Sequence, residues 1–194
     1  LNIIHDSFDV IPVSEHYILQ MHKILYSHMN NSIAGKIKSV QNNINTTHPD
    51  GHTEVLFTPL SPFETSEALD NICNEYNKVI GNLEVDMLIA IPIFIHDFLC
   101  IYTFKYGNGG MSRLLTALVL YRSGFYVGKY ISLEALIAKN KEAYYESFDK
   151  SGVNWHEENE DILPFLKYLL GTILAAYKEF EDRFSIVEDT LPTV

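Results

Sequence analysis

Residues 91–125 read IPIFIHDFLCIYTFKYGNGGMSRLLTALVLYRSGF, and two long apolar segments in this stretch flank one glycine-rich turn. The first segment follows Asp86, a residue type that caps helices, and is apolar nearly all round, which is typical of a central helix covered by others. The second segment ends at a glycine, which commonly terminates helices. We therefore predict two core helices, at 86–104 and at about 110–123, joined by the tight turn Lys105–Gly109.

The turn between these helices carries a pattern suited to binding anions. Gly107, Gly109 and Gly110 allow several backbone N–H groups to point into one concavity, and the N-terminus of the following helix adds a partial positive charge. Arg113 lies one helical turn further on and would close on a phosphate with two hydrogen bonds. The alternative is a tight corner between two helices with Arg113 paired to a neighbouring acid, and spacing alone favours this alternative.

Helical spacing and turn residues predict the remaining architecture. Further helices are expected at 14–29, 65–80, 132–149 and 161–184, with N-caps at Ser14, Thr65 or Ser66, and Ser132, and with fraying after Ser185. A stretch rich in Asn, Ser, Thr and Gly leads into a strand at 53–57 that prolines end, which indicates a short β-hairpin at about 53–62. The predicted fold class is a mostly α helical bundle with one hairpin.

The composition is that of an ordinary folded domain. A chain of 194 residues with 47% hydrophobic and 20% charged residues fits a single domain, 1–194, with a sizeable core. Fourteen Lys and Arg against 25 Asp and Glu give a net charge of −11, which disfavours binding to nucleic acid or to anionic membranes. Cys73 and Cys100 are too few for a disulfide framework and are predicted to be buried hydrophobes. The longest apolar run, Met87–Ile95, is far short of the about 20 residues that span a bilayer, and no signal peptide opens the chain, so we expect a cytoplasmic protein.

The central stretch resembles the core of the Fic/Doc (Fido-fold) family, whose signature reads His-x-Phe-x-Asp/Glu-Gly-Asn-Gly-Arg-x-x-Arg. Residues 102–113 fall on this motif, and the matching residues are Phe104, Gly107, Asn108, Gly109 and Arg113. Upstream, LFTPLSPFETSEAL at 56–69 looks like the family's flap hairpin and the helix after it. The resemblance covers most of the chain and implies a Fic/Doc-type helical bundle. Because the chain starts at Leu1 without Met, we leave open an inhibitory segment or antitoxin outside it.

This resemblance implies that the protein binds ATP and transfers AMP to a hydroxyl side chain of a target protein. The implied nucleotide-binding residues, with Phe104 packing the loop into the core and Arg113 holding a phosphate, are Phe104, Gly107, Asn108, Gly109, Gly110 and Arg113. The flap would align a segment of the target by backbone pairing, through Val55, Leu56, Phe57, Thr58, Pro59 and Leu60.

Four replacements fall at the chemistry of the family motif. Tyr102 stands where the motif has the His that takes the proton from the attacking hydroxyl, and a phenol with a pKa near ~10 is a poor base at neutral pH. Tyr106 stands at the acidic position that binds Mg²⁺ in the family, so we expect no metal site. Gly110 replaces the first Arg, which removes one phosphate clamp, and Thr103 replaces the usual Pro.

We expect no other histidine to replace the missing base. His96 lies six residues before Tyr102, on nearly the opposite face of the same helix, and is predicted to be a core residue. His16, His22 and His28 lie at six-residue intervals without i, i+4 pairs and are predicted to be surface residues. The buried face of their helix is predicted to carry Ile18, Met21, Leu25 and Met29.

The sequence thus predicts a folded protein with an impaired site. It is either an adenylyltransferase of very low activity or a non-catalytic module that binds a nucleotide or a protein. The implied partners are ATP or another nucleotide and an unknown target protein, and a homo-oligomer is left open. The rings of Tyr102 and Tyr106 either fill the phosphate cavity or present hydroxyl donors to an anion, and both alternatives fit the sequence.

Overall fold

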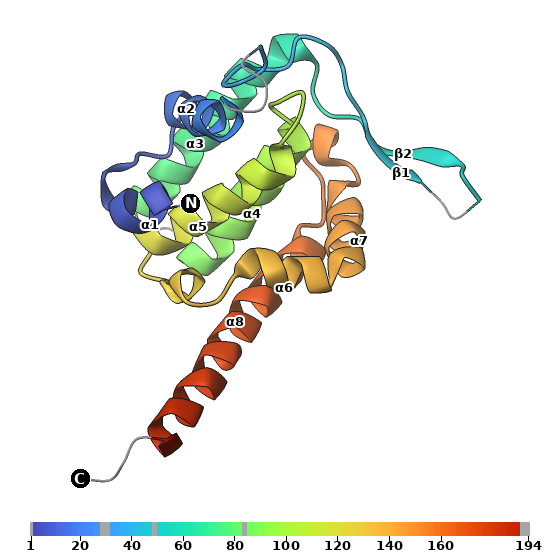
Figure 1. Cartoon of the computed structure of the whole chain (residues 1–194). Coiled ribbons are helices and arrows are strands. Elements are labelled where there is room, and N and C mark those ends of the chain that lie inside the picture. The colour runs from blue at the N-terminus through green and yellow to red at the C-terminus, as the bar shows by residue number, and fades with distance from the viewer. Residues whose placement is uncertain (1, 28–31, 48–49, 83–84, 191–194) are drawn as a thin grey trace.

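The computed structural model describes residues 2–27, 32–47, 50–82 and 85–190, in which helices surround a central pair and a two-stranded sheet projects from them (Figure 1). The mostly α fold class with a short hairpin is therefore confirmed. In chain order the elements are α1 (Asn2–Ser7), η1 (Phe8–Val10), α2 (Glu15–Tyr26), β1 (Ile44–Thr47), β2 (Thr53–Phe57), α3 (Pro62–Asn82), α4 (Met87–Ile101), α5 (Asn108–Arg122), η2 (Val127–Lys129), α6 (Leu133–Lys139), α7 (Lys141–Gly152), η3 (Trp155–Glu157) and α8 (Leu163–Thr190). Within the described ranges, no helix is both long and apolar enough to cross a membrane.

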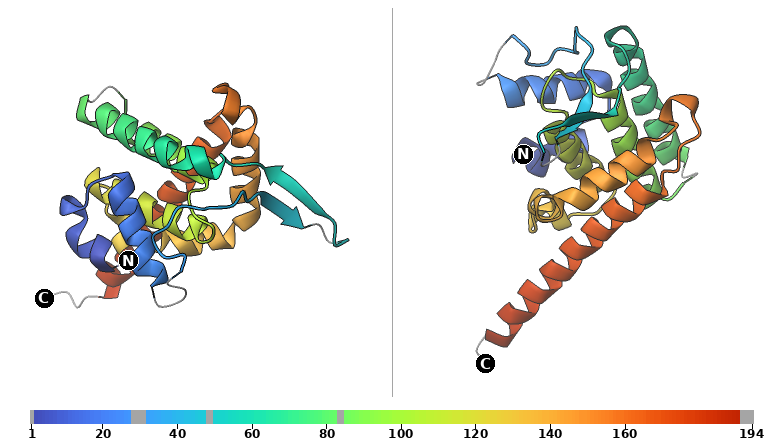
Figure 2. Two further views of the ribbon diagram at one scale, coloured as in Figure 1. Left: turned by 90° about the horizontal axis from the view of Figure 1, so that it is seen from above. Right: turned by 90° about the vertical axis from the view of Figure 1, so that its right-hand side faces the viewer.

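The helices α4 and α5 form the centre of the bundle, with α2 and α3 on one side and α6, α7 and α8 on the other (Figures 1 and 2). Asp86 caps α4 as predicted, because its Oδ1 accepts a hydrogen bond of 2.8 Å from the Leu88 N–H. Helix α4 ends at Ile101, earlier than predicted, because Tyr102 takes the left-handed conformation with φ of 54°. Both cysteines are free and buried, as expected.

Several predicted helix boundaries are wrong. Helix α3 begins at Pro62 rather than at Thr65 or Ser66, because the Ser61 N–H donates to the Glu64 carboxylate (3.2 Å) and proline suits the first helical position. The single helix expected at 132–149 is divided into α6 and α7, because Asn140 between them has φ of −127° and ψ of 46°, outside the helical region. Helix α8 continues to Thr190, past the predicted fraying point.

The predicted strand at 53–57 is present, but it pairs with 44–47, so the expected hairpin bounds of about 53–62 are wrong. The base of the hairpin is fixed to the bundle. Strands β1 and β2 pair antiparallel, with Asn45 opposite Val55, and a bulge follows at Ile44, which pairs with Phe57. The bulge leaves Leu56 without an opposite residue, so two successive side chains can turn toward the bundle. The Phe57 ring packs edge-on against Phe148 of α7 at 5.9 Å. Strands β1 and β2 extend away from the helices (Figure 2).

A buried polar cluster ties α4 to the C-terminal elements. His96 is 0% exposed, packs between the rings of Phe148 and Phe165, and hydrogen-bonds the Phe148 backbone. Next to it, Asp97 accepts a hydrogen bond of 2.8 Å from the indole N–H of Trp155. Burial lowers the pKa of His96 to about 4 and raises the pKa of Asp97 to about 6. The expectation that His96 is a core residue is therefore confirmed.

These two neighbours predict opposing effects of pH on stability. Between pH 4 and 6.5 the folded His96 stays neutral while the unfolded one binds a proton, so this group destabilises the fold on acidification, by up to about 3 kcal/mol. Asp97 is protonated in the folded state below about pH 6 and ionised in the unfolded state down to about 3.8, so it stabilises the fold on acidification. The Asp97→Asn variant should therefore lose more free energy of unfolding than the wild type between pH 6.5 and 4, as measured by urea denaturation.

The control for this experiment is Asp149→Asn, which changes an exposed carboxylate on α7. Its stability should follow the wild-type pH profile. A profile of Asp97→Asn parallel to that of the wild type would show that the Asp97 carboxyl titrates at the same pH in the folded and unfolded states.

Candidate functional site

The loop between α4 and α5 is closed by a reciprocal pair of hydrogen bonds. The Asn108 side-chain oxygen accepts from the Phe104 N–H at 2.9 Å, and the Asn108 side-chain NH₂ donates to the Phe104 carbonyl at 2.7 Å. Asn108 is 1% exposed, so its side chain serves the loop rather than the surface. At the end of the loop, Gly107 has φ of 85°, and a Cβ there would lie 2.3 Å from the Tyr26 hydroxyl oxygen. The loop therefore requires glycine at 107 and an amide at 108.

His22 on α2 is the main side-chain support of this loop, and the prediction that it lies on the surface is wrong. It is 1% exposed, and its ring stacks on Phe104 with the centroids 3.7 Å apart. Its Nδ1 accepts the Gly35 N–H at 2.9 Å, so the proton is on Nε2, which donates to the Tyr106 carbonyl at 3.1 Å. Burial lowers the pKa of His22, which favours this neutral form.

The helical spacing of α2 contains the signal that would have placed His22. The residue lies four positions after the buried Ile18, on the same face of the helix. Ser14 caps α2 as predicted, by accepting a hydrogen bond from the Tyr17 N–H at 3.4 Å. Of the predicted buried face, Leu25 is 42% exposed and Met29 lies outside the described residues.

Lys38 supports the same loop from the long connection before the hairpin. It is 3% exposed, and its ammonium donates to the carbonyl of Ile101, at the end of α4, at 3.0 Å. Its backbone N–H donates to the Thr103 carbonyl at 3.0 Å, and the adjacent Ile37 forms a β-bridge with Phe104. Burial lowers the pKa of Lys38 to about 8. The sequence around Lys38 gives no signal for this role, because its apolar residues do not recur with the spacing of a helix or a strand.

A cavity of about 390 Å³ opens between the start of α5, the hairpin and α7, and we call it the hairpin cavity. Four of the residues predicted for the site line it: Leu56, Tyr102, Gly109 and Arg113. Sequence analysis did not single out the other lining residues, which are Asn43, Ile44, Asn45, Leu99, Lys141, Tyr144, Tyr145 and Phe148. Ser112 donates to the Gly109 carbonyl at 2.9 Å and also hydrogen-bonds the Tyr144 hydroxyl, which joins α7 to the first turn of α5. The cavity thus combines a helix N-terminus, two cationic side chains and several aromatic rings.

Not all of the predicted site residues reach this cavity. Phe104 and Asn108 are buried beneath the loop. Of the other predicted flap residues, Phe57 and Pro59 are buried, Leu60 is half-buried, and Val55 and Thr58 are exposed. His156 contacts the Thr58 carbonyl through Nε2 at 2.8 Å, which helps to fix the exit of the hairpin.

Arg113 is paired with an acid. Its Nε donates to Glu134 Oε1 of α6 at 2.7 Å, while the Arg113 side chain stays 38% exposed and the Glu134 side chain 57% exposed. Arg113 lines the hairpin cavity and also a second cavity of about 550 Å³, which Gly110 and Glu134 line as well. The ion pair therefore competes with any anion for this guanidinium.

The two tyrosines of the motif have different environments. Tyr102 is half-buried and lines the hairpin cavity, and burial raises its pKa while a hydrogen bond to Asn108 opposes the rise. Tyr106 is 55% exposed and is not among the lining residues, so its ring does not fill the cavity. None of the residues lining the cavity is Asp or Glu, and this donor set does not fit Mg²⁺, which prefers carboxylate oxygen.

The close contact at Gly107 predicts a strong effect of adding one methyl group. Gly107→Ala would place a Cβ against Tyr26 in a left-handed conformation, so it should destabilise the protein by about 1–3 kcal/mol. Gly81→Ala is the control, because the added Cβ meets no atom within 4 Å at an exposed helical position and should be neutral or stabilising. Thermal unfolding of both variants checks this. Equal melting temperatures would show that the loop adapts to the methyl group.

Comparison with known proteins identifies the family. The model described as the Fic/DOC family matches residues 12–120. The curated protein adenylyltransferase fic-1 of Caenorhabditis elegans is 26% identical over 152 residues, which are 78% of this chain but only 25% of that protein. Among solved structures, Fic-1 from C. elegans superposes with a TM-score of 0.71 at 22% identity, over 95% of this chain and 49% of that chain. A Fic domain containing signaling protein from Bacteroides thetaiotaomicron superposes with a TM-score of 0.69 at 21% identity, over 90% and 65% of the two chains.

This chain spans about a quarter of the curated relative and from about half to two thirds of these solved structures. The family match extends over more than half of the chain and includes α4, the loop and most of α5. The helical bundle, the projecting hairpin and the loop closed by Asn108 are thus those of a protein that belongs to the Fic/DOC family.

Proposed function

We propose that the chain binds a nucleoside triphosphate, ATP by resemblance, in the hairpin cavity, and that its transfer of AMP to a target hydroxyl is severely impaired. The observation that carries the proposal is that the α5 N-terminus and Arg113 line one cavity. The described residues that line this cavity include no Asp or Glu. Similarity to a protein named as an adenylyltransferase supports the type of reaction.

The cavity offers suitable partners for both parts of a nucleotide. The first-turn N–H groups at Gly109 and the side chains of Arg113 and Lys141 suit the phosphates, since a helix N-terminus and cations both attract anions. Tyr144, Tyr145 and Ile44 provide aromatic and apolar surface for a base. The cavity volume, about 390 Å³, lies within the usual range for small-molecule sites, about 300–1,000 Å³.

Transfer would require a base that this site does not supply. The hydroxyl of the target must lose its proton as its oxygen attacks the α-phosphorus and pyrophosphate leaves. Tyr102 stands at the base position, and burial raises the pKa of its phenol above an already high value. Losing a general base typically reduces the rate by a factor of about 10²–10⁴. The absence of a motif arginine at Gly110 and of a carboxylate at Tyr106 reduces it further.

The hairpin is the proposed docking element for the target protein. In the described residues the sheet has two strands, so each strand keeps one edge that is not paired within it. A target segment would add to such an edge through backbone hydrogen bonds, which tolerate many target sequences. Fixing the hairpin base through Phe57 and His156 would hold that segment close to the cavity.

A second candidate function is protein docking without a nucleotide. The contact between Arg113 and Glu134 favours it, because the ion pair already satisfies the charge that would hold a phosphate. Titration of the protein with ATP separates the two functions.

Glu134→Gln should increase the affinity for ATP by about tenfold, because it removes the competing charge and frees the Arg113 guanidinium. Arg113→Gln should weaken binding by at least the same factor. Calorimetry with and without Mg²⁺ measures both effects, and we expect binding that is insensitive to Mg²⁺. Glu179→Gln on α8, which breaks an exposed ion pair with Arg183 far from the cavity, should leave the affinity unchanged.

Absence of ATP binding at millimolar concentration, in the wild type and in Glu134→Gln alike, would exclude the nucleotide proposal. That result would support protein docking through the hairpin.

Restoring the three motif side chains should restore AMP transfer. The triple variant Tyr102→His, Tyr106→Asp and Gly110→Arg fits the backbone, because histidine adopts the left-handed conformation more readily than most residues, and a Cβ at 110 has Leu25 Cδ2 as its nearest atom, at 3.9 Å. We expect labelling of the protein or of a lysate by radiolabelled ATP, at least about a hundredfold above the wild type.

Adding Arg113→Ala to the triple variant is the control and should remove the labelling. A triple variant that is folded by circular dichroism, binds ATP and labels nothing would contradict the assignment of these three positions to the chemistry.

A further inference from the structure

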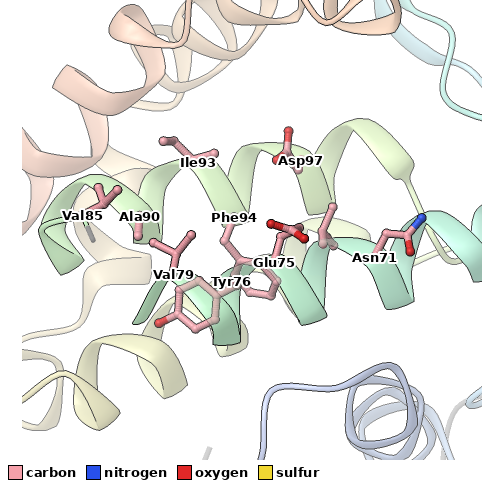
Figure 3. A pocket seen from close by; sticks show the side chains of 10 residues that line it. Asn71, Glu75, Tyr76, Val79, Val85, Ala90, Ile93, Phe94 and Asp97 are labelled. Carbon is pink, nitrogen blue, oxygen red and sulfur yellow. The ribbon is translucent and has the colours of Figure 1, made fainter. Parts of the chain in front are cut away.

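A second recess lies between α3 and α4 and shares no lining residue with the hairpin cavity (Figure 3). Its volume is about 290 Å³. The floor is apolar and buried: the rings of Tyr76 and Phe94 lie 4.7 Å apart, beside Ala90. At the rim, Val85 and Ile93 are each 37% exposed. We call this recess the α3–α4 groove.

One end of the groove is acidic. Asp97 and Glu75 lie at this end, with Asn71 beyond them, while Val85 lies at the other end (Figure 3). The Tyr76 hydroxyl hydrogen-bonds Ser123, so it is engaged outside the groove. None of the residues lining the groove is Lys, Arg or His.

Asp97 is the carboxylate best placed to recognise a ligand. The Trp155 indole donates to its Oδ1 at 2.8 Å, and no cation contacts this carboxylate among the residues that the structure describes. Burial and the nearby charge of Glu160 both raise the pKa of Asp97, to about 6. At neutral pH Asp97 is thus an ionised carboxylate that has one neutral donor and, within the described ranges, no cation beside it. A positive ligand would stabilise this arrangement.

The neighbouring Glu75 has a cation of its own. Its carboxylate lies 3.6 Å from Lys78, and both side chains are more than 60% exposed, so this ion pair is weak. Asp97 is therefore the carboxylate that would interact with a ligand bound in the groove.

The chemistry of the lining selects one class of ligand. An anion would be repelled by two carboxylates and by a net charge of −11. A neutral apolar molecule would remove water from Asp97 without replacing its hydrogen bonds. A metal ion lacks ligands, since the described residues contain no group of three or more His, Cys, Asp or Glu suited to hold one. A protonated amine on an apolar body satisfies both ends of the groove.

We propose that the α3–α4 groove binds a small organic amine, whose ammonium group donates to Asp97 and whose aliphatic or aromatic body packs on Tyr76 and Phe94. Aromatic faces also attract cations, so the rings of Tyr76 and Phe94 favour a ligand that carries an ammonium group. The volume suits a single ring with a short amino chain, near the lower limit for ligand sites. This site is independent of the proposed nucleotide function, and neither result decides the other.

Phenethylamine is the probe, with 2-phenylethanol and 3-phenylpropionate as partners that share its ring but carry a neutral or a negative head. Titration of the isotope-labelled 194-residue chain, followed by amide NMR shifts, should show phenethylamine binding at a Kd of about 1 mM or below, with the largest shifts at α3 and α4. The alcohol should bind at least about tenfold more weakly, and the carboxylate should not bind.

Two variants separate the charge from the apolar floor. Asp97→Asn keeps an acceptor for Trp155 and should weaken amine binding by about tenfold or more without changing alcohol binding, whereas Asp149→Asn on α7 should change neither. Ile93→Ser at the exposed rim should weaken both ligands to a similar extent.

The pH dependence provides a further test. The groups that surround Asp97 are Glu75 across the groove, Glu160 ahead of α8, Trp155 of η3, and His96 and Cys100 on its own helix. Amine affinity should fall as pH decreases through about 6, because the carboxyl then takes up a proton.

Equal affinities for amine and alcohol, an unchanged affinity in Asp97→Asn, or no shifts at α3 and α4 would each overturn the proposal. Tighter binding of N-acetyl-lysine methylamide than of phenethylamine would also overturn it, by assigning the groove to a lysine side chain of a protein partner.

Discussion

The two hydrogen bonds between Asn108 and Phe104 are the constraint on which the organisation of this protein depends. They close the loop that links the two central helices and so fix where α5 begins. Because the Phe104 backbone is held, its side chain enters the core and stacks on His22. Through His22 and Lys38, α2 and the long connection before the hairpin are bound to the same loop. Two segments distant from it in sequence therefore converge on one short turn.

This arrangement explains how the scaffold accommodates Tyr102, Tyr106 and Gly110 in and around the loop. The N-terminus of α5 presents backbone N–H groups, and its geometry depends on Gly107 and Asn108. The Tyr102 phenol hydrogen-bonds Asn108, whereas Gly110 has no side chain that could support the loop. The Tyr106 carbonyl does support the loop, but any residue supplies a carbonyl.

Electrostatic pairing decides which groups are available to ligands. The Arg113 guanidinium lines two cavities and is held by Glu134. The Asp97 carboxylate meets an indole N–H and, in the part of the chain that the structure describes, no cation. One charge is already neutralised and the other is not, although both lie at the surface of the same bundle. Contacts between elements of the fold decide which charges find a partner. Along the sequence, Glu134 lies 21 residues from Arg113, and Trp155 lies 58 residues from Asp97.

The sequence by itself determined the two central helices, the cap at Asp86, the strand at 53–57, the glycine-rich turn and the family, because these features depend on local periodicity and on motif spacing. The same local signals placed α3 three residues late and merged α6 with α7, since propensity locates the ends of helices poorly. Only the tertiary structure decided that His22 is buried, that Lys38 caps α4, that α7 completes the hairpin cavity, and that Arg113 meets Glu134. Each of these depends on contacts between residues far apart in the chain, and one sequence carries no local pattern that records such contacts.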